Sequence, residues 1–148
     1  ADVRDYPSRM GDVHELLTTD DVFLAATEIL RGIAEAESCV VTGRRGFFVF
    51  RNHPNHLSVF IQASMPFRVE RVARKQNVTL KEARRTIEKV DKTRENYVKR
   101  YTDSSRYDTR NYDLVLSMDG MTEDDAVEVI LDYINRSARI EEVEKESK

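Results

Sequence analysis

Apolar residues recur at helical spacing in the first well-patterned segment of the chain. They lie three or four positions apart, at Val22, Phe23, Ala26, Ile29, Leu30 and Ile33. This period is typical of an amphipathic helix. Thr19, followed by Asp20 and Asp21, supplies a helix cap with acidic residues at the positive end of the helix. The pattern therefore predicts a helix from this cap to about Ala36.

Three later segments carry short apolar runs, and the second of them, 57–61, has little polar alternation, as a strand covered on both faces does. The predicted strands are 39–42, 57–61 and 112–118. Cys39 is expected to be a buried residue at the start of the first strand and not a nucleophile. The period of residues 46–50 fits a helical turn or extended chain equally well.

Further helices are predicted over 66–76, 79–100 and 122–136. Pro66 suits a first helical turn, and the capping-box pattern begins the helix at 79. Strands that alternate with helices indicate the α/β class, here a three-layer parallel sheet with flanking helices.

Composition narrows the class of protein. The chain has 148 residues, of which 40% are hydrophobic and 34% charged, as expected for one globular domain. The net charge of −3 argues against a general nucleic-acid binder, and no apolar run is long enough to span a bilayer. One cysteine is compatible with a reducing, cytoplasmic setting. The composition does not indicate an oligomeric state.

Charge is strongly polarised along the sequence. Residues 68–100 hold twelve basic and five acidic residues, a net of +7, so the rest of the chain carries −10. Arg68 and Arg71 lie three residues apart and so share a helix face, as do Asp91 and Arg94. The region is interpreted as a phosphate-binding surface, a solvated helical pair or, less favoured, a nucleic-acid surface. Arginine's fork of donors suits phosphate oxygens, which favours the first interpretation.

Other candidate residues carry weaker signals. His53 and His56 have no third ligand nearby in the sequence, so no metal site is predicted. Four tyrosines flank the basic helix, at Tyr97, Tyr101, Tyr107 and Tyr112. Packing is the favoured role for them, and stacking on a nucleotide base is the alternative.

Three segments together resemble the cytidylate kinase-like family of P-loop nucleoside monophosphate kinases. They read CVVTGRRGFFVF, HLSVFIQASMPFRVERVARKQNVTLKEARRTIEKVDKTRENYVKRY and NYDLVLSMDGMTEDDAVEVILDYI, and the resemblance covers roughly residues 20–136. It implies transfer of the terminal phosphoryl group of ATP to a nucleoside monophosphate, CMP or dCMP, with Mg²⁺. Nucleotides are then the expected partners, without nucleic acid or membrane.

The resemblance also implies roles for individual residues. Arg44 would contact the acceptor phosphate, with Arg45 beside it. The expected catalytic residues are Arg68, Arg71, Asp91 and Arg94, and the expected phosphate-binding residues are Arg44, Arg45, Arg68, Arg71 and Arg94. Arg45 and Gln62 stand where cytidylate kinases tend to carry aspartate, which leaves the acceptor base open.

The family begins with a strand, a glycine-rich phosphate loop and a helix. Nothing in the 148 residues matches G-x-x-x-x-G-K-[ST]. The chain is therefore expected to lack the central first strand and to be inactive alone, with another segment or another chain filling the gap. A noncatalytic nucleotide- or phosphate-binding module is the alternative.

The implied layout is one kinase-like domain over 1–136. It comprises an irregular acceptor-side segment at 1–19 and a lid-like helical region at 65–111, and a charged tail follows at 137–148.

Overall fold

The computed structural model describes residues 19–137. The irregular segment expected at 1–19 and the tail expected at 137–148 lie outside this range, apart from one residue of each. The chain divides into two compact units with their boundary between Val41 and Thr42, and each unit is described by itself. The expectation of a single domain over 1–136 stays a prediction.

The described part of the first unit consists of helix α1, Thr19–Ala36, followed by irregular chain to Val41. The helix has its predicted bounds, with Asp20 and Asp21 in its first turn. Phe23 is buried, and the buried Thr27 hydroxyl donates a hydrogen bond to the carbonyl oxygen of Phe23 (2.9 Å).

The strand predicted at 39–42 is absent from the described structure. Val40 is 93% exposed and Cys39 is also exposed, so the expectation that Cys39 is buried was wrong. A strand exists only where a neighbour accepts and donates its backbone hydrogen bonds, and no described segment pairs with these residues. Local apolar composition alone therefore misled the prediction.

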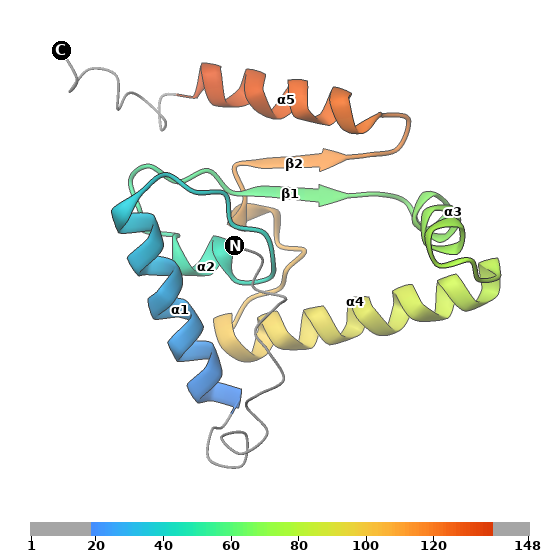
Figure 1. Ribbon diagram of the computed structural model, residues 1–148, viewed down its shortest axis with the longest axis horizontal. Helices are drawn as coiled ribbons and strands as arrows, with labels where there is room; N and C mark the ends of the chain where they lie inside the picture. Colours follow the sequence, from blue (N-terminus) through green and yellow to red (C-terminus); the bar gives the residue numbers. More distant parts are fainter. Residues whose placement is uncertain (1–18, 138–148) are drawn as a thin grey trace. The chain divides into compact units, whose positions relative to one another are not determined.

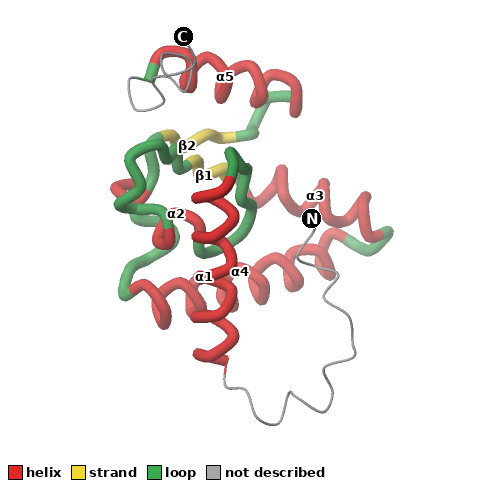
Figure 2. The backbone as a smooth tube through the Cα atoms, turned by 60° about the vertical axis from the view of Figure 1, so that its left-hand side comes forward, coloured by secondary structure: helices red, strands yellow, loops and turns green. Residues whose placement is uncertain are grey.

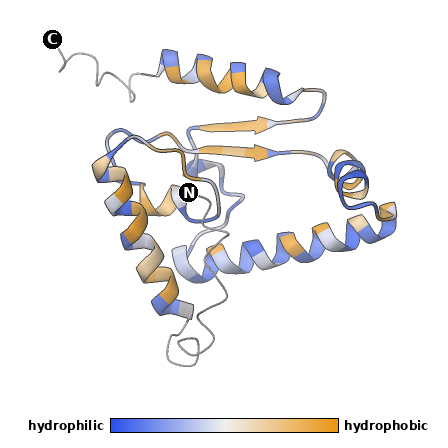
Figure 3. Cartoon of the chain, viewed as in Figure 1, coloured by the Kyte–Doolittle hydropathy of each residue, from blue (hydrophilic) through white to orange (hydrophobic). Residues whose placement is uncertain are grey.

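The second unit contains a parallel sheet of two strands. Strand β1, Val59–Gln62, pairs with β2, Leu114–Ser117, in the register Val59 with Leu114 and Gln62 with Ser117. Both strands are largely hydrophobic (Figure 3), and each ends in a polar residue, Gln62 in β1 and Ser117 in β2. Two of the three predicted strands are thus confirmed within about two residues, and the α/β class is confirmed. The three-layer arrangement stays a prediction.

Five further elements complete the second unit (Figure 1). They are α2 (Gly46–Val49), α3 (Met65–Gln76), α4 (Leu80–Thr102), the 3₁₀ helix η3 (Thr109–Asn111) and α5 (Glu123–Arg136). The region at 46–50 is therefore helical, which resolves the alternative left open by its period. None of the helices in the described residues is long and apolar enough to cross a membrane.

The helix ends follow their local sequence. Ser64 caps α3, which ends at Asn77 in the left-handed conformation (φ 54°). Thr79 caps α4 with Glu82 in a complete capping box, as predicted. Thr122 begins α5 in the same way. These caps satisfy backbone N–H groups that a helix leaves without partners, and so they fix where each helix begins.

Helices α3 and α4 form a helical pair with its own apolar core. Val69, Ala73, Ala83 and Ile87 are buried between them, and Met65, Val72 and Val78 pack at the edges. Figure 2 shows the two helices joined by the short turn at 77–79. This core fixes the position of the basic face of α3 relative to the basic face of α4.

Two aspartates connect the ends of the strands to neighbouring segments. Asp113, before β2, accepts a hydrogen bond from the Ser58 N–H (2.9 Å). Asp119, after β2, accepts one from the Ser64 N–H (2.8 Å) at the start of α3. Hydrogen bonds from Ser64 lower the pKa of Asp119. The start of α3 is thereby tied to the carboxyl end of both strands.

The core between α3 and α4 predicts the effect of removing one apolar side chain. Ile87 is 5% exposed, so Ile87→Ala should destabilise the fold by about 2–5 kcal/mol, measured by urea unfolding. Leu80→Ala on the same helix is the matched control, because Leu80 is 59% exposed. Equal losses in the two variants would show that the helical pair is not held by this core.

Candidate functional site

A cavity of about 510 Å³ lies at the carboxyl ends of the two parallel strands. Its walls include Gln62 and Ala63 at the end of β1, Met118 after β2, and residues of α3, α4 and α5. Four arginines and two carboxylates line it: Arg68, Arg71, Arg94, Arg106, Asp91 and Glu123. Ligands of open α/β sheets bind in this position.

Arg68 and Asp91 form the central ion pair of the cavity. Arg68 Nη1 and Nη2 donate to the two carboxylate oxygens of Asp91, at 2.8 and 2.6 Å. The side chains are 31% and 18% exposed. The hydrogen bonds that Arg68 donates to Asp91 raise the pKa of Arg68. Two parallel bonds fix the orientation of the guanidinium as well as its position, and they join α3 to α4.

Arg71, one helical turn along α3, pairs instead with Glu123 in the first turn of α5 (3.0 Å). These side chains are 50% and 77% exposed. Exposed pairs of this kind contribute little to stability. Arg71 is therefore available to another anion at small cost.

Arg94 lines the cavity from α4, one turn beyond Asp91. Arg106 lines it from the loop after α4, with Nη1 at 4.0 Å from Asp91. Asp91 thus holds Arg68 and approaches Arg106, although the sequence pattern suggested Arg94 as its neighbour on the helix.

The lining of the cavity carries an excess of positive charge. Four guanidinium groups face two carboxylates, which leaves a formal charge of +2. Charged groups around a concave, partly buried surface attract ions of opposite sign more strongly than the same groups on an open surface. The arrangement is suited to an anion with several oxygen acceptors.

Two predicted phosphate-binding residues lie elsewhere in the second unit. The Arg44 guanidinium stacks over the ring of Tyr97, 4.0 Å from its centroid, and that of Arg45 is 5.8 Å from the same centroid. Neither lines the cavity. The structure therefore brings Arg68, Arg71, Asp91 and Arg94 together around one cavity and places Arg44 and Arg45 outside its lining, and the roles of all six residues stay predictions.

The histidine pair makes no metal cluster with its surroundings. His53 Nδ1 accepts a hydrogen bond from the Asn55 N–H (3.2 Å) within its own loop. Residues 19–137 contain no group of three His, Cys, Asp or Glu side chains placed to hold a metal ion.

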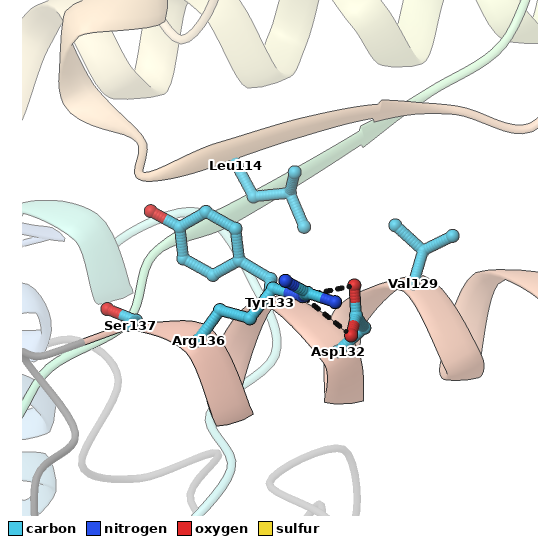
Figure 4. Close-up of a pocket in the computed structure, with 6 residues that line it drawn as sticks. All are labelled: Leu114, Val129, Asp132, Tyr133, Arg136 and Ser137. Atoms are coloured by element: carbon cyan, nitrogen blue, oxygen red, sulfur yellow. Dashed lines mark hydrogen bonds and ion pairs between the residues drawn. The ribbon is translucent and has the colours of Figure 1, made fainter.

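A second hollow of about 410 Å³ lies between β2 and α5 (Figure 4). Apolar side chains of Leu114, Val129 and Tyr133 line it, together with Asp132 and Arg136. The two charged groups pair with each other at 3.0 Å. Their charges balance, so this hollow lacks the positive excess of the first.

A sequence model of the cytidylate kinase-like family matches residues 3–120. The chain belongs to the cytidylate kinase-like family. All four arginines and Asp91 of the cavity fall within the matched residues, whereas Glu123 lies just beyond them.

Two known proteins are similar to this family member. A cytidylate kinase from Methanopyrus kandleri is 28% identical over 121 residues, which cover 74% of this chain and 61% of that protein. The chain therefore spans less than two thirds of that relative. The crystal structure of an uncharacterized protein from Eubacterium ventriosum superposes with a TM-score of 0.76 at 28% identity, and covers 82% of this chain and 69% of the other.

The sequence did not single out Arg106 as a site residue. It lies in a loop, where no helical period relates it to Arg68 or Arg94. The only signal was its place among tyrosines that follow the basic helix. Its approach to Asp91 depends on the fold, because Arg106 lies 15 positions after Asp91 in the chain.

The geometry of the central pair predicts the effect of neutralising Asp91. Asp91→Asn should destabilise the fold by about 1–3 kcal/mol in urea unfolding, because it leaves Arg68 and Arg106 facing each other without a carboxylate. Glu88→Gln is the control. Glu88 forms an exposed pair with Arg84 on the same helix, and its loss should cost under about 0.5 kcal/mol. Equal, small effects in both variants would contradict the central role of Asp91.

Proposed function

We propose that the arginine-lined cavity binds the phosphate groups of nucleotides, and that the complete protein transfers the terminal phosphoryl group of ATP to a nucleoside monophosphate. The observation that carries the proposal is the convergence of four arginines from α3, α4 and the following loop at the carboxyl ends of parallel strands. Membership of the cytidylate kinase-like family supports the same reaction class.

The cavity offers the chemistry that phosphoryl transfer requires. The transferred group carries negative charge on its peripheral oxygens, and catalysis consists mainly of positioning and charge stabilisation. Arg71 can exchange its exposed partner Glu123 for a phosphate oxygen, and no carboxylate in residues 19–137 pairs with Arg94. Arg68 lines the cavity and stays oriented by its two hydrogen bonds to Asp91. The family resemblance implies catalytic roles for the same four residues, Arg68, Arg71, Asp91 and Arg94.

CMP or dCMP is the proposed acceptor, because the similar protein from Methanopyrus kandleri is a cytidylate kinase. Gln62 lines the cavity at the end of β1, together with the ring of Phe60. An amide side chain can both donate and accept hydrogen bonds, so Gln62 is suited to contact the edge of a base. This differs from the aspartate that the family tends to carry here.

The described residues are suited to the phosphates of ATP but offer no site for Mg²⁺. The arginines fit the phosphates of ATP. The two cavity carboxylates, Asp91 and Glu123, are both engaged by arginines, so the described residues offer no magnesium site of their own. Mg²⁺ in such enzymes is held largely by phosphate oxygens and water.

A noncatalytic nucleotide-binding module is the second candidate. It is favoured by one observation, that the 148 residues contain no glycine-rich phosphate loop to orient the donor. Within residues 19–137, β1 pairs on one side only, with β2. In the kinase proposal, a phosphate-loop strand from elsewhere in the protein or from another chain pairs with its other edge. Both candidates use the same cavity.

Nucleotide binding tests the proposal directly. Calorimetric titration of the chain with CMP and with ATP should detect binding to at least one. Arg94→Gln and Arg71→Gln should each weaken it by about tenfold, since each removes a charge-assisted hydrogen bond.

Arg84→Gln is the control, because Arg84 is an exposed arginine of α4 outside the cavity and already paired with Glu88. The nucleotide affinity of the Arg84→Gln variant should match that of the unsubstituted chain. Absence of binding to either nucleotide, or equal losses in all three variants, would contradict the proposed site.

A further inference from the structure

Arg106 is held in an unusual environment for a cation. Its side chain is 18% exposed, and its guanidinium lies 5.7 Å from the ring centroid of Phe60 and 5.2 Å from that of Tyr107. Aromatic faces attract cations, but they accept no conventional hydrogen bond from a guanidinium. Burial has therefore removed water from this group without replacing all of its hydrogen bonds.

The Nη1 atom of Arg106 is buried and donates no hydrogen bond to any described residue. Its nearest carboxylate oxygen, Asp91 Oδ1, lies at 4.0 Å and already accepts the 2.6 Å bond from Arg68. A distance of 4.0 Å is too long for a hydrogen bond. A desolvated charged donor without an acceptor is costly, so a ligand acceptor at this point would be strongly favoured.

The loop that carries Arg106 is fixed by its own hydrogen bonds. The Tyr112 hydroxyl donates to the carbonyl oxygen of Arg106 (2.6 Å), and the Asn111 side-chain amide donates to Ser104 Oγ and the Ser105 carbonyl (both 3.0 Å). Arg106 is thus presented to the cavity by an ordered turn. A pre-positioned donor loses little conformational entropy when it binds a ligand.

We infer that Arg106 is a further phosphate-binding residue of the cavity, and that its Nη1 atom donates to an oxygen of the bound nucleotide. The inference rests on the proposed function. It adds a donor from the loop after α4 to those of Arg71 and Arg94, which line the same cavity. Asp91 orients Arg68, and its negative charge offsets the repulsion between Arg68 and Arg106.

The alternative is that Arg106 only packs between Phe60 and Tyr107. The two roles differ in what the substitution Arg106→Met changes. Methionine keeps a long, polarizable chain for the aromatic rings and removes every donor. If Arg106 binds phosphate, the unliganded variant should be as stable as the unsubstituted chain or more stable, because a desolvated cation has been removed. The variant should differ unfavourably from the unsubstituted chain only in its affinity for the ligand.

The experiment compares unsubstituted chain, Arg106→Met, Arg106→Lys and Arg110→Met by calorimetric titration with inorganic tripolyphosphate, CMP and ATP. Arg110 is the matched control, because it lies four residues along the same segment, is 87% exposed and pairs with Asp108. Arg106→Met should lower the affinity for tripolyphosphate, and for at least one of the nucleotides, by about tenfold or more. Arg106→Lys should retain part of the affinity, and Arg110→Met should change it less than twofold.

Thermal unfolding of the same four proteins, with and without tripolyphosphate, completes the test. Loss of the ligand-induced rise in Tm in Arg106→Met, with a Tm without ligand that is unchanged or higher, supports the inference. Equal affinities of Arg106→Met and the unsubstituted chain would overturn it while leaving the proposed function intact. Absence of binding by the unsubstituted chain would overturn both. The nucleotide whose affinity falls more shows whether Arg106 faces donor or acceptor phosphates.

Discussion

The bidentate pair between Arg68 of α3 and Asp91 of α4 is the interaction on which the site depends. It connects two helices whose facing surfaces are otherwise held by a small apolar core around Ala83 and Ile87. It also places one carboxylate beside two guanidinium groups, which allows Arg106 to stay partly buried near Arg68. Two guanidinium groups beside the same carboxylate would repel each other strongly in a partly desolvated cavity if the carboxylate were removed.

The second constraint is the tie between the strands and α3. Asp119 follows β2 and holds the backbone of Ser64, the residue that caps α3. The first turn of α3 is therefore fixed at the carboxyl end of the sheet, and Arg68 and Arg71 follow one turn apart along that helix. Backbone hydrogen bonds set the position of the helix, and the arginine side chains then face the cavity as a consequence of helical spacing.

The sequence predicted features that depend on neighbouring residues, and it missed features that depend on residues far apart in the chain. The capping box at Thr79 and the end of α3 at Gln76 depend on local sequence, and both were predicted correctly. The pairing of Arg71 with Glu123, and the approach of Arg106 to Asp91, depend on tertiary contacts that no periodic pattern encodes. The strand predicted at 39–42 failed for a related reason, because strands need a partner and Val40 has none among residues 19–137.

The proposed function requires that this cavity holds phosphate groups. A crystal structure of the chain with a bound nucleotide tests it most directly. A phosphate group should lie within hydrogen-bond distance of at least two of Arg68, Arg71 and Arg94. A nucleotide bound only outside the cavity, for example between α5 and β2, would contradict the account.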